Sequence, residues 1–236
     1  MKLNSATWIF LSAALFQLTG LSASAQSPRS TPAQAPSYMG RQIARTMHWQ
    51  GAAWLVRQKR EREEAALEMR ANLGLKPGMV VCDMGSGNGY HSLPIAKAVG
   101  ASGKVFAVDL QPEMIEMLRE RCQKAGVTNI EAIVGQQKDA CLPAASCDLI
   151  LLVDVYHEFA KPAEMLRSMR QALKPGGLVA LVEFRAEDPE VPIRPEHKMS
   201  RAQILRELEA NGFALSQEYK ALPWQHLMFF KVAANL

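Results

Sequence analysis

The chain has 236 residues, of which 48% are hydrophobic and 21% charged, the proportions of a packed globular protein. This composition excludes a mainly disordered chain, a collagen-like repeat and a polytopic membrane protein. The formal net charge is only +4, and no basic block suggests nucleic acid as a partner.

The first 25 residues have the composition of a secretory signal peptide. A positive charge at Lys2 precedes an apolar run over 8–18, and Ala23-Ser24-Ala25 places small residues at a cleavage site. The run is shorter than the ~20 residues of a membrane span, although a retained anchor is the alternative interpretation. We therefore expect cleavage before Gln26, export to the periplasm or out of the cell, and no stable membrane insertion afterwards. Residues 26–36, rich in Pro, Ser and Ala, are predicted to be a linker.

Residues 37–74 are predicted to form an N-terminal helical cap on a single domain that spans 37–236. Large apolar residues recur at helical spacing in this segment, and strong helix formers follow them. A segment this short cannot bury a core of its own. We therefore expect it to lie over a ligand cleft, with Trp49 and Trp54 as a wall of the acceptor site.

From residue 80 onward, apolar strands alternate with helices. The expected strands lie over residues 80–83, 104–109, 130–134, 149–153 and 178–183, and 214–219 and 227–232 form a final strand pair. The expected helices lie over 90–99, 112–125, 162–173 and from a capping box of Ser200 and Gln203 to Gly212. This alternation predicts an α/β fold with a parallel sheet that helices cover on both faces.

A glycine-rich turn follows the first expected strand. Residues 83–89 read Asp-Met-Gly-Ser-Gly-Asn-Gly, so the backbone can bend sharply and approach a ligand closely. A dinucleotide-binding fold requires a glycine at position 90, which is Tyr here. Asp83 would repel a pyrophosphate and attract a cationic ligand. Asp109 ends the next expected strand, where its carboxylate can accept both hydroxyls of a ribose.

This stretch resembles the class I S-adenosylmethionine-dependent methyltransferases. The resemblance runs from about residue 80 to the C-terminus and is carried by three features of the sequence. These are the Asp-x-Gly-x-Gly-x-Gly motif, the correctly spaced acid at position 109, and the Leu-Lys-Pro-Gly-Gly-Leu turn over 173–178. The resemblance implies a Rossmann-like, doubly wound, seven-stranded sheet, mostly parallel with a reversed C-terminal strand.

The resemblance also implies a cofactor and an activity. S-adenosylmethionine is the expected cofactor, with Gly85, Gly87 and Gly89 at its methionine and ribose portions and Asp109 on the ribose hydroxyls. The expected function is methyl transfer from this cofactor to an acceptor. Because the sequence has no motif for a peptide, lipid or nucleic acid, we expect the acceptor to be a small molecule.

One family element is altered. Many of these enzymes carry Gly-Asp-Ala-x-x-Leu-Pro after the third strand, with the Asp on the adenine. Here residues 135–143 read Gly-Gln-Gln-Lys-Asp-Ala-Cys-Leu-Pro, which shifts the acid along the chain. Either Asp139 or Gln136 can therefore meet the adenine amino group, and Asp139 is preferred because it precedes Ala as in the family.

The end of the fourth expected strand carries the candidate catalytic groups. Residues 154–159 read Asp-Val-Tyr-His-Glu-Phe, a cluster of titratable side chains at the ligand edge of the sheet. In this position Asp154 can hold the cofactor ammonium, His157 can act as a base and Glu158 can orient it, with Tyr156 as a further candidate. The alternative is that His157 and Glu158 cap the next helix and pair with each other.

Other polar residues near this edge carry weaker expectations. Glu183 and Arg185 leave the next strand at the same edge and can reach the same cleft, whereas His197 and Lys198 are expected at the surface. No metal site is expected, because the five histidines show neither i,i+4 nor His-x-His spacing.

The cysteine pattern allows one short disulfide loop. The four cysteines include no Cys-x-x-Cys pair, but Cys141 and Cys147 could close a short disulfide loop in an oxidising compartment.

An exported protein that binds S-adenosylmethionine without catalysis is the main alternative to an enzyme. An oxidoreductase is a third class, and both Tyr90 and Asp83 argue against it.

Overall fold

The computed structural model describes residues 36–234. The predicted signal peptide over 1–25 and nearly all of the predicted linker over 26–36 lie outside the described residues. Among the helices of residues 36–234, none combines the length and the apolar character needed to cross a membrane.

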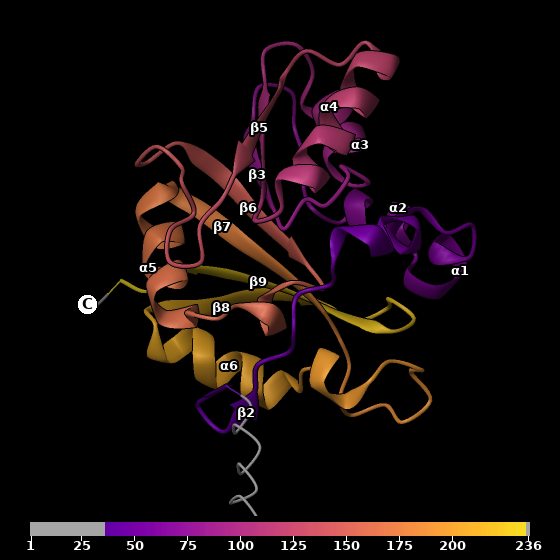
Figure 1. The fold of residues 1–236 in the computed structure, drawn as a ribbon. Coiled ribbons are helices and arrows are strands. Elements are labelled where there is room, and N and C mark those ends of the chain that lie inside the picture. The colour runs from indigo at the N-terminus through magenta and orange to yellow at the C-terminus, as the bar shows by residue number, and fades with distance from the viewer. Residues whose placement is uncertain (1–35, 235–236) are drawn as a thin grey trace, which may run out of the picture. The chain divides into compact units, whose positions relative to one another are not determined.

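A seven-stranded sheet organises the described chain (Figure 1). Its order is β5-β4-β3-β6-β7-β9-β8, with parallel pairing from β5 to β7 and antiparallel pairing of β9 with both neighbours. The strands are β3 (Val80–Met84), β4 (Lys104–Asp109), β5 (Ile130–Val134), β6 (Cys147–Val153), β7 (Leu173–Phe184), β8 (Phe213–Tyr219) and β9 (Gln225–Val232). The expected sheet with one reversed strand is confirmed.

Helices on both faces bury the sheet. They are α3 (Ser92–Val99), α4 (Pro112–Ala125), α5 (Pro162–Ala172) and α6 (Arg201–Ala210), with short 3₁₀ turns η2 (Tyr156–Glu158) and η3 (Pro195–His197). Along β6, Ile150 and Leu152 pack in a core with α5 and α6, while Leu149 and Leu151 pack in a second core with α3. Alternation of side chains along a strand thus explains why β6 reads as an unbroken apolar run.

Local chain chemistry sets most helix ends. Pro112 occupies the first turn of α4, and Gly126 closes that helix with a left-handed φ of 64°. At α6, the Ser200 hydroxyl accepts a hydrogen bond from the Gln203 amide at 3.1 Å. The Gln203 side chain donates to Glu207 and to the Met39 carbonyl, so only half of the expected capping box forms.

The segment before β3 is less helical than expected. Residues 37–42 form a small hairpin of β1 (Ser37–Tyr38) and β2 (Arg41–Gln42), joined at Met39 and Gly40, which both have positive φ. Helical turns begin only at η1 (Trp49–Val56), followed by α1 (Arg60–Glu64) and α2 (Ala66–Ala71). Ala65 separates α1 from α2 with a φ of 48°, so no continuous helix crosses this segment.

The disulfide that the sequence left possible between Cys141 and Cys147 is not formed in the structure. Residues 36–234 contain all four cysteines of the chain, and every one of them is a free thiol. Cys147 is fully buried at the start of β6, whereas Cys141 is half-buried in the preceding loop. The two side chains therefore belong to different environments although only a few residues separate them.

A buried carboxylate joins the N-terminal hairpin to the domain. Glu207 on α6 is fully buried and accepts hydrogen bonds from Arg41 Nε at 2.7 Å and from the Tyr156 hydroxyl at 2.8 Å. Arg41 also donates to the His157 carbonyl at 3.0 Å. Removing one partner of such a pair leaves the other charge buried and uncompensated.

We predict that Arg41→Ala lowers the free energy of unfolding by about 3 kcal/mol, because it leaves the buried Glu207 carboxylate without its positively charged partner. Urea denaturation followed by circular dichroism measures the change. The control is Arg206→Ala, which removes an exposed guanidinium that also reaches the hairpin, at 3.4 Å from the Met39 carbonyl. The control should change stability by less than about 0.5 kcal/mol. Equal effects of the two substitutions would contradict this account of Glu207.

Candidate cofactor and acceptor site

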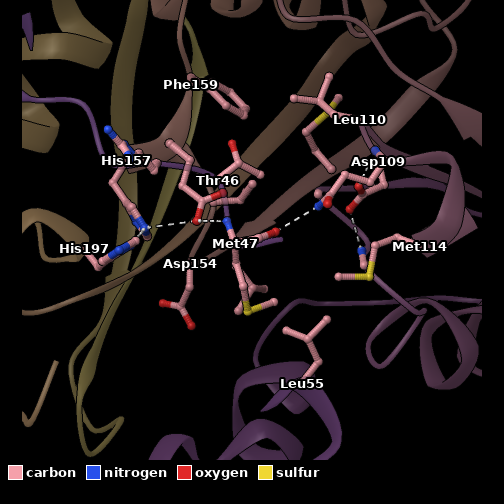
Figure 2. Close-up of a pocket in the computed structure, with 18 of the residues that line it drawn as sticks. Thr46, Met47, Leu55, Asp109, Leu110, Met114, Asp154, His157, Phe159 and His197 are labelled. Carbon is pink, nitrogen blue, oxygen red and sulfur yellow. Dashed lines mark hydrogen bonds and ion pairs between the residues drawn. The ribbon is translucent and has the colours of Figure 1, made fainter. Parts of the chain in front are cut away.

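A cavity of about 750 Å³ opens at the carboxyl ends of the parallel strands. This is the edge where ligands bind in open α/β sheets, and pockets for small ligands usually measure roughly 300–1,000 Å³. Met84, Asp109, Asp154 and Phe184, which end or follow β3, β4, β6 and β7, all line it. Figure 2 shows acidic, histidine and apolar side chains gathered around this space.

Two glycines of the predicted motif lie against the cavity. Gly85 and Gly87 line it, and both have positive φ, at 73° and 53°. A Cβ at Gly85 would overlap the Val155 side chain, and one at Gly87 would overlap Leu55. Gly89 does not line the cavity, and the atoms nearest to its missing Cβ belong to helix side chains. The motif therefore lines the cavity at two positions and serves helix packing at the third.

Asp109 stands at the end of β4 beside these glycines. Its two carboxylate oxygens accept hydrogen bonds from the Gly87 and Gln111 amides, each at 2.9 Å. Burial raises the pKa of Asp109, although these backbone amides offset part of the shift. Each oxygen keeps a further lone pair, so the carboxylate is held in place and can still accept hydrogen bonds from a ligand.

Asp154 lines the cavity and has an unsatisfied carboxylate oxygen. The residue follows β6 with a φ of 53°, and the Gln225 side chain donates to its Oδ2 at 2.7 Å. Its Oδ1 is buried and has no hydrogen-bond partner among the described residues. Burial, together with the nearby Glu64 and Glu183, raises the pKa of Asp154 well above its ordinary value. A cationic donor in the cavity would satisfy this oxygen and stabilise its charged form.

Asp83 and Asp139, predicted to contact the cofactor, lie outside the lining of the cavity. Asp83 is buried between β3 and α3, where the Ser92 hydroxyl donates to it at 2.5 Å. Asp139 is exposed and accepts hydrogen bonds from the Cys141 amide and the Ser168 hydroxyl. Gln136 does line the cavity, so its position, and not that of Asp139, suits a contact to adenine.

In the predicted catalytic cluster, the carboxylate that contacts the His157 ring most closely is not the expected one. His157 is buried, and its Nδ1 lies 2.6 Å from Oε2 of Glu183 at the end of β7. Glu183 therefore orients the imidazole, the role expected of Glu158. Glu158 lines the cavity, with Oε1 3.9 Å from His157 Nε2. Tyr156 does not line the cavity, because its hydroxyl points to Glu207, so the structure gives it no catalytic position.

His197 is the residue at this site that sequence reasoning missed. It was expected at the surface, but it is half-buried and lines the cavity, with Nδ1 3.0 Å from His157 Nε2 (Figure 2). No local signal marks it, since 40 residues separate it from His157. Lys198 donates a hydrogen bond to the Asp188 carbonyl, and Arg185 donates one to a carbonyl in the loop before β9.

The protonation of this cluster follows from burial and close charges. Burial by itself lowers the pKa of His157, but the Glu183 carboxylate outweighs it and the net pKa is raised. Burial raises the pKa of Glu158 to about 7, although His157 opposes the shift. Burial and the neighbouring His157 lower the pKa of His197. All three groups line one cavity and have shifted pKa values, as is common in sites of acid–base or ligand chemistry.

The N-terminal segment crosses the cavity and is fixed on both sides of it. The Met47 amide donates to Glu158 Oε1 at 3.3 Å, while the Met47 carbonyl accepts from Gln111 Nε2 at 2.9 Å. The Trp49 amide donates to Gln111 Oε1 at 2.7 Å. Trp54 lines the cavity as predicted, whereas Trp49 does not.

Comparison with known proteins agrees with this geometry. A protein-family model described as a methyltransferase domain matches residues 75–226, more than half of the chain. The chain belongs to this methyltransferase-domain family. The family and the fold together support an S-adenosylmethionine-dependent methyltransferase, with S-adenosylmethionine as the cofactor.

The relatives of known function match only part of their own length. The protein-L-isoaspartate O-methyltransferase of Pyrococcus horikoshii is 33% identical over 103 residues, 44% of this chain and 43% of that protein. The ubiquinone/menaquinone biosynthesis C-methyltransferase UbiE of Salmonella arizonae is 30% identical over 112 residues, 47% of this chain and 45% of that protein. The chain thus matches less than half the length of these relatives.

Solved structures share the fold. A SAM-dependent methyltransferase from Aquifex aeolicus superposes with a TM-score of 0.75 and 24% identity, over 80% of this chain and 100% of that one. A possible exported protein from Bordetella parapertussis superposes with a TM-score of 0.57 and 20% identity, over 75% of this chain and 68% of that one.

We predict that Asp83→Asn makes the protein more stable above about pH 6. Burial raises the pKa of Asp83 to about 6, even though the Ser92 hydroxyl and Arg60 lower it in part. Between the unfolded value of 3.8 and this folded value, unfolding releases a proton, so wild-type stability falls as pH rises. The Asn side chain keeps an acceptor for Ser92 and carries no charge.

Chemical denaturation at pH 4, 5, 6 and 7.5 measures this effect. The free energy of unfolding of the variant should exceed that of the wild type by an amount that grows with pH and reaches about 2–3 kcal/mol. Asp148→Asn is the control of opposite sign, because its hydrogen bonds from Lys174 and the Val80 amide lower its pKa against the effect of burial. A gap for Asp83→Asn that is the same at all four pH values would refute the assignment.

Proposed function

We propose that this protein transfers a methyl group from S-adenosylmethionine to a small-molecule acceptor. The observation that carries the proposal concerns Asp154, which lines the cavity and whose buried Oδ1 has no hydrogen-bond partner among the described residues. Asp109 lines the same cavity, as do Gly85 and Gly87, where there is no room for a Cβ. A ligand that brings both a cation and ribose hydroxyls satisfies this set of groups.

The residues fit S-adenosylmethionine group by group. Asp154 would receive the ammonium of its methionine portion, Asp109 the ribose hydroxyls, and Gln136 the adenine edge. Gly85 and Gly87, at which a Cβ would overlap Val155 and Leu55, would let the backbone approach the cofactor closely. When bound, this cofactor supplies an electrophilic methyl carbon on a sulfonium sulfur, which keeps the electron pair of the broken C–S bond.

The acceptor's proton would be handled by the cluster of His157, Glu158 and His197. Glu183 holds Nδ1 of His157, so Nε2 carries the lone pair that faces Glu158 and His197 when the imidazole is neutral. An acceptor whose nucleophilic atom arrives protonated needs such a group, because a protonated atom cannot attack the methyl carbon. The segment over 45–55 would exclude water from this reaction and position the acceptor.

A protein that binds the cofactor without catalysis is the second candidate. The convergence of three titratable side chains beside the cofactor groups favours an enzyme, since cofactor binding alone does not require them. An oxidoreductase is disfavoured by Tyr90 in place of the third dinucleotide glycine and by the match to the methyltransferase-domain family.

We predict that Asp109→Ala weakens S-adenosylmethionine binding at least about tenfold, since hydrogen bonds to a charged group contribute roughly 1.5–3 kcal/mol. Isothermal titration calorimetry on the purified protein measures the affinity. The matched control is Asp139→Ala, which removes an exposed carboxylate outside the cavity and should leave affinity within about twofold of wild type.

Several outcomes would contradict the proposed cofactor site. Wild-type protein that binds NAD but not S-adenosylmethionine would remove the methyltransferase assignment. A greater loss in Asp139→Ala than in Asp109→Ala would move the cofactor away from the end of β4.

We further propose that the protein is exported. Support comes from the charge, apolar run and small-residue order of residues 1–25. The predicted mature chain begins at Gln26. N-terminal sequencing of the protein recovered from its native host, with fractionation into soluble and membrane-bound pools, tests this directly. An intact Met1 on protein from the cytoplasmic fraction would refute it.

A further inference from the structure

Three potential metal ligands from two separate loops converge at one end of the cavity. His157 and Glu158 belong to η2 after β6, and His197 belongs to η3 after β7. His157 Nε2 lies 3.0 Å from His197 Nδ1 and 3.9 Å from Glu158 Oε1, and all three ligand atoms lie within 4.8 Å of one another. Two imidazole nitrogens and one carboxylate oxygen form a donor set typical of zinc and other divalent first-row metals.

The spacing of these atoms suits a bound cation. Bonds of about 2.1 Å in a tetrahedral arrangement place ligand atoms about 3.4 Å apart. His157 Nε2 lies 3.0 Å from His197 Nδ1 and 3.9 Å from Glu158 Oε1, distances on either side of that value. Three protein ligands also leave at least one coordination position open, which is the arrangement of catalytic and not of structural metal sites.

A second carboxylate supports the same interpretation. Glu183 is fully buried, and its Oε2 lies 2.6 Å from His157 Nδ1, while its Oε1 accepts from the His157 amide at 3.3 Å. Metal-bound histidines almost always donate their second ring N–H to such an outer carboxylate, which fixes the tautomer and orients the ring. With the proton on Nδ1, Nε2 is left as the coordinating atom, and it is the atom that faces His197 and Glu158.

We propose that His157, Glu158 and His197 bind a divalent first-row cation, with Zn²⁺ as the reference ion, and that its open position takes an ionisable hydroxyl of the acceptor. The role in catalysis rests on the proposed methyl transfer, whereas the cation site does not. On coordination the acceptor O–H bond breaks, its electron pair stays on oxygen, and the proton passes to water. The cation would lower the pKa of that hydroxyl, so the cluster would promote loss of the acceptor's proton through the bound cation. With the cation bound, Nε2 of His157 acts as a ligand in place of the base considered for the metal-free cluster.

The proposal is tested on untagged full-length protein that has been freed of metal with a chelator. Cobalt(II) is added and followed by its visible absorption, which reports the number and geometry of ligands, and Zn²⁺ is titrated by calorimetry. We expect one cation per chain and a low-symmetry cobalt spectrum that Zn²⁺ abolishes by competition.

Variants identify the ligands. His197→Gln removes a half-buried side chain from a loop and is expected to leave the sheet folded, so it serves as the first variant, with Glu158→Gln as the second. Each should weaken cation affinity at least tenfold and alter the cobalt spectrum. The control is His48→Gln, an exposed histidine outside the cluster, which should match wild type. Glu183→Gln tests the positioning residue and should weaken affinity by roughly 10–100-fold while one cation per chain still binds.

The results separate this proposal from the proposed function. Absence of cation binding in wild type, or equal binding in wild type, His197→Gln and Glu158→Gln, overturns the metal site. S-adenosylmethionine affinity is measured on the same samples with and without Zn²⁺. Cation binding at the three ligands without any S-adenosylmethionine binding would keep the metal site and overturn the methyl-transfer proposal.

Discussion

The buried carboxylate of Glu207 is the constraint on which the acceptor side of the site depends. It lies on α6 and accepts hydrogen bonds from Arg41 and Tyr156, which precede β3 and follow β6 respectively. Arg41 and the Ala44 amide in turn donate to the carbonyl of His157. A buried charge is tolerated only when it is paired and hydrogen-bonded. Satisfying Glu207 therefore fixes the N-terminal hairpin and the backbone of His157 together, and Tyr156 acts through this link instead of touching a ligand.

Most of the fold could be predicted because its signals are local. Parallel strands buried on both faces read as continuous apolar runs, as in β6, and Pro112 and Gly126 mark the ends of α4 wherever the rest of the chain lies. The hairpin over 37–42 was missed because its turn depends on positive φ at Met39 and Gly40, and Met at such a position gives no signal. The positions of two motif glycines and of Asp109 at the cavity were predictable for the same local reason, since the glycines follow one strand and the acid ends the next.

The acceptor end of the site could be predicted only in part, because strand adjacency creates it. β6 and β7 are neighbours in the sheet, so the end of β7 places Glu183 beside the loop that carries His157, and the chain after β7 brings His197 to the same loop. Spacing rules for histidines within one helix or strand do not detect such a pair. Asp139 failed for a related reason: a loop of altered length moves its carboxylate to Ser168, and Gln136 takes the place at the cavity. Sequence position inside a loop does not determine which side chain reaches a site.

The charges around the cavity also bear on which ligand Asp154 can accept. Asp154 is buried with one oxygen unpartnered among the described residues, and Glu64 and Glu183 stand close enough to raise its pKa further. In these surroundings the neutral acid is the favoured form of Asp154, because an unpaired buried charge is strongly disfavoured. A cationic group that binds at Oδ1 reverses this preference and expels the proton. The surroundings of Asp154 would therefore select for a cationic ligand, since a neutral or anionic ligand would leave its carboxylate without a partner charge.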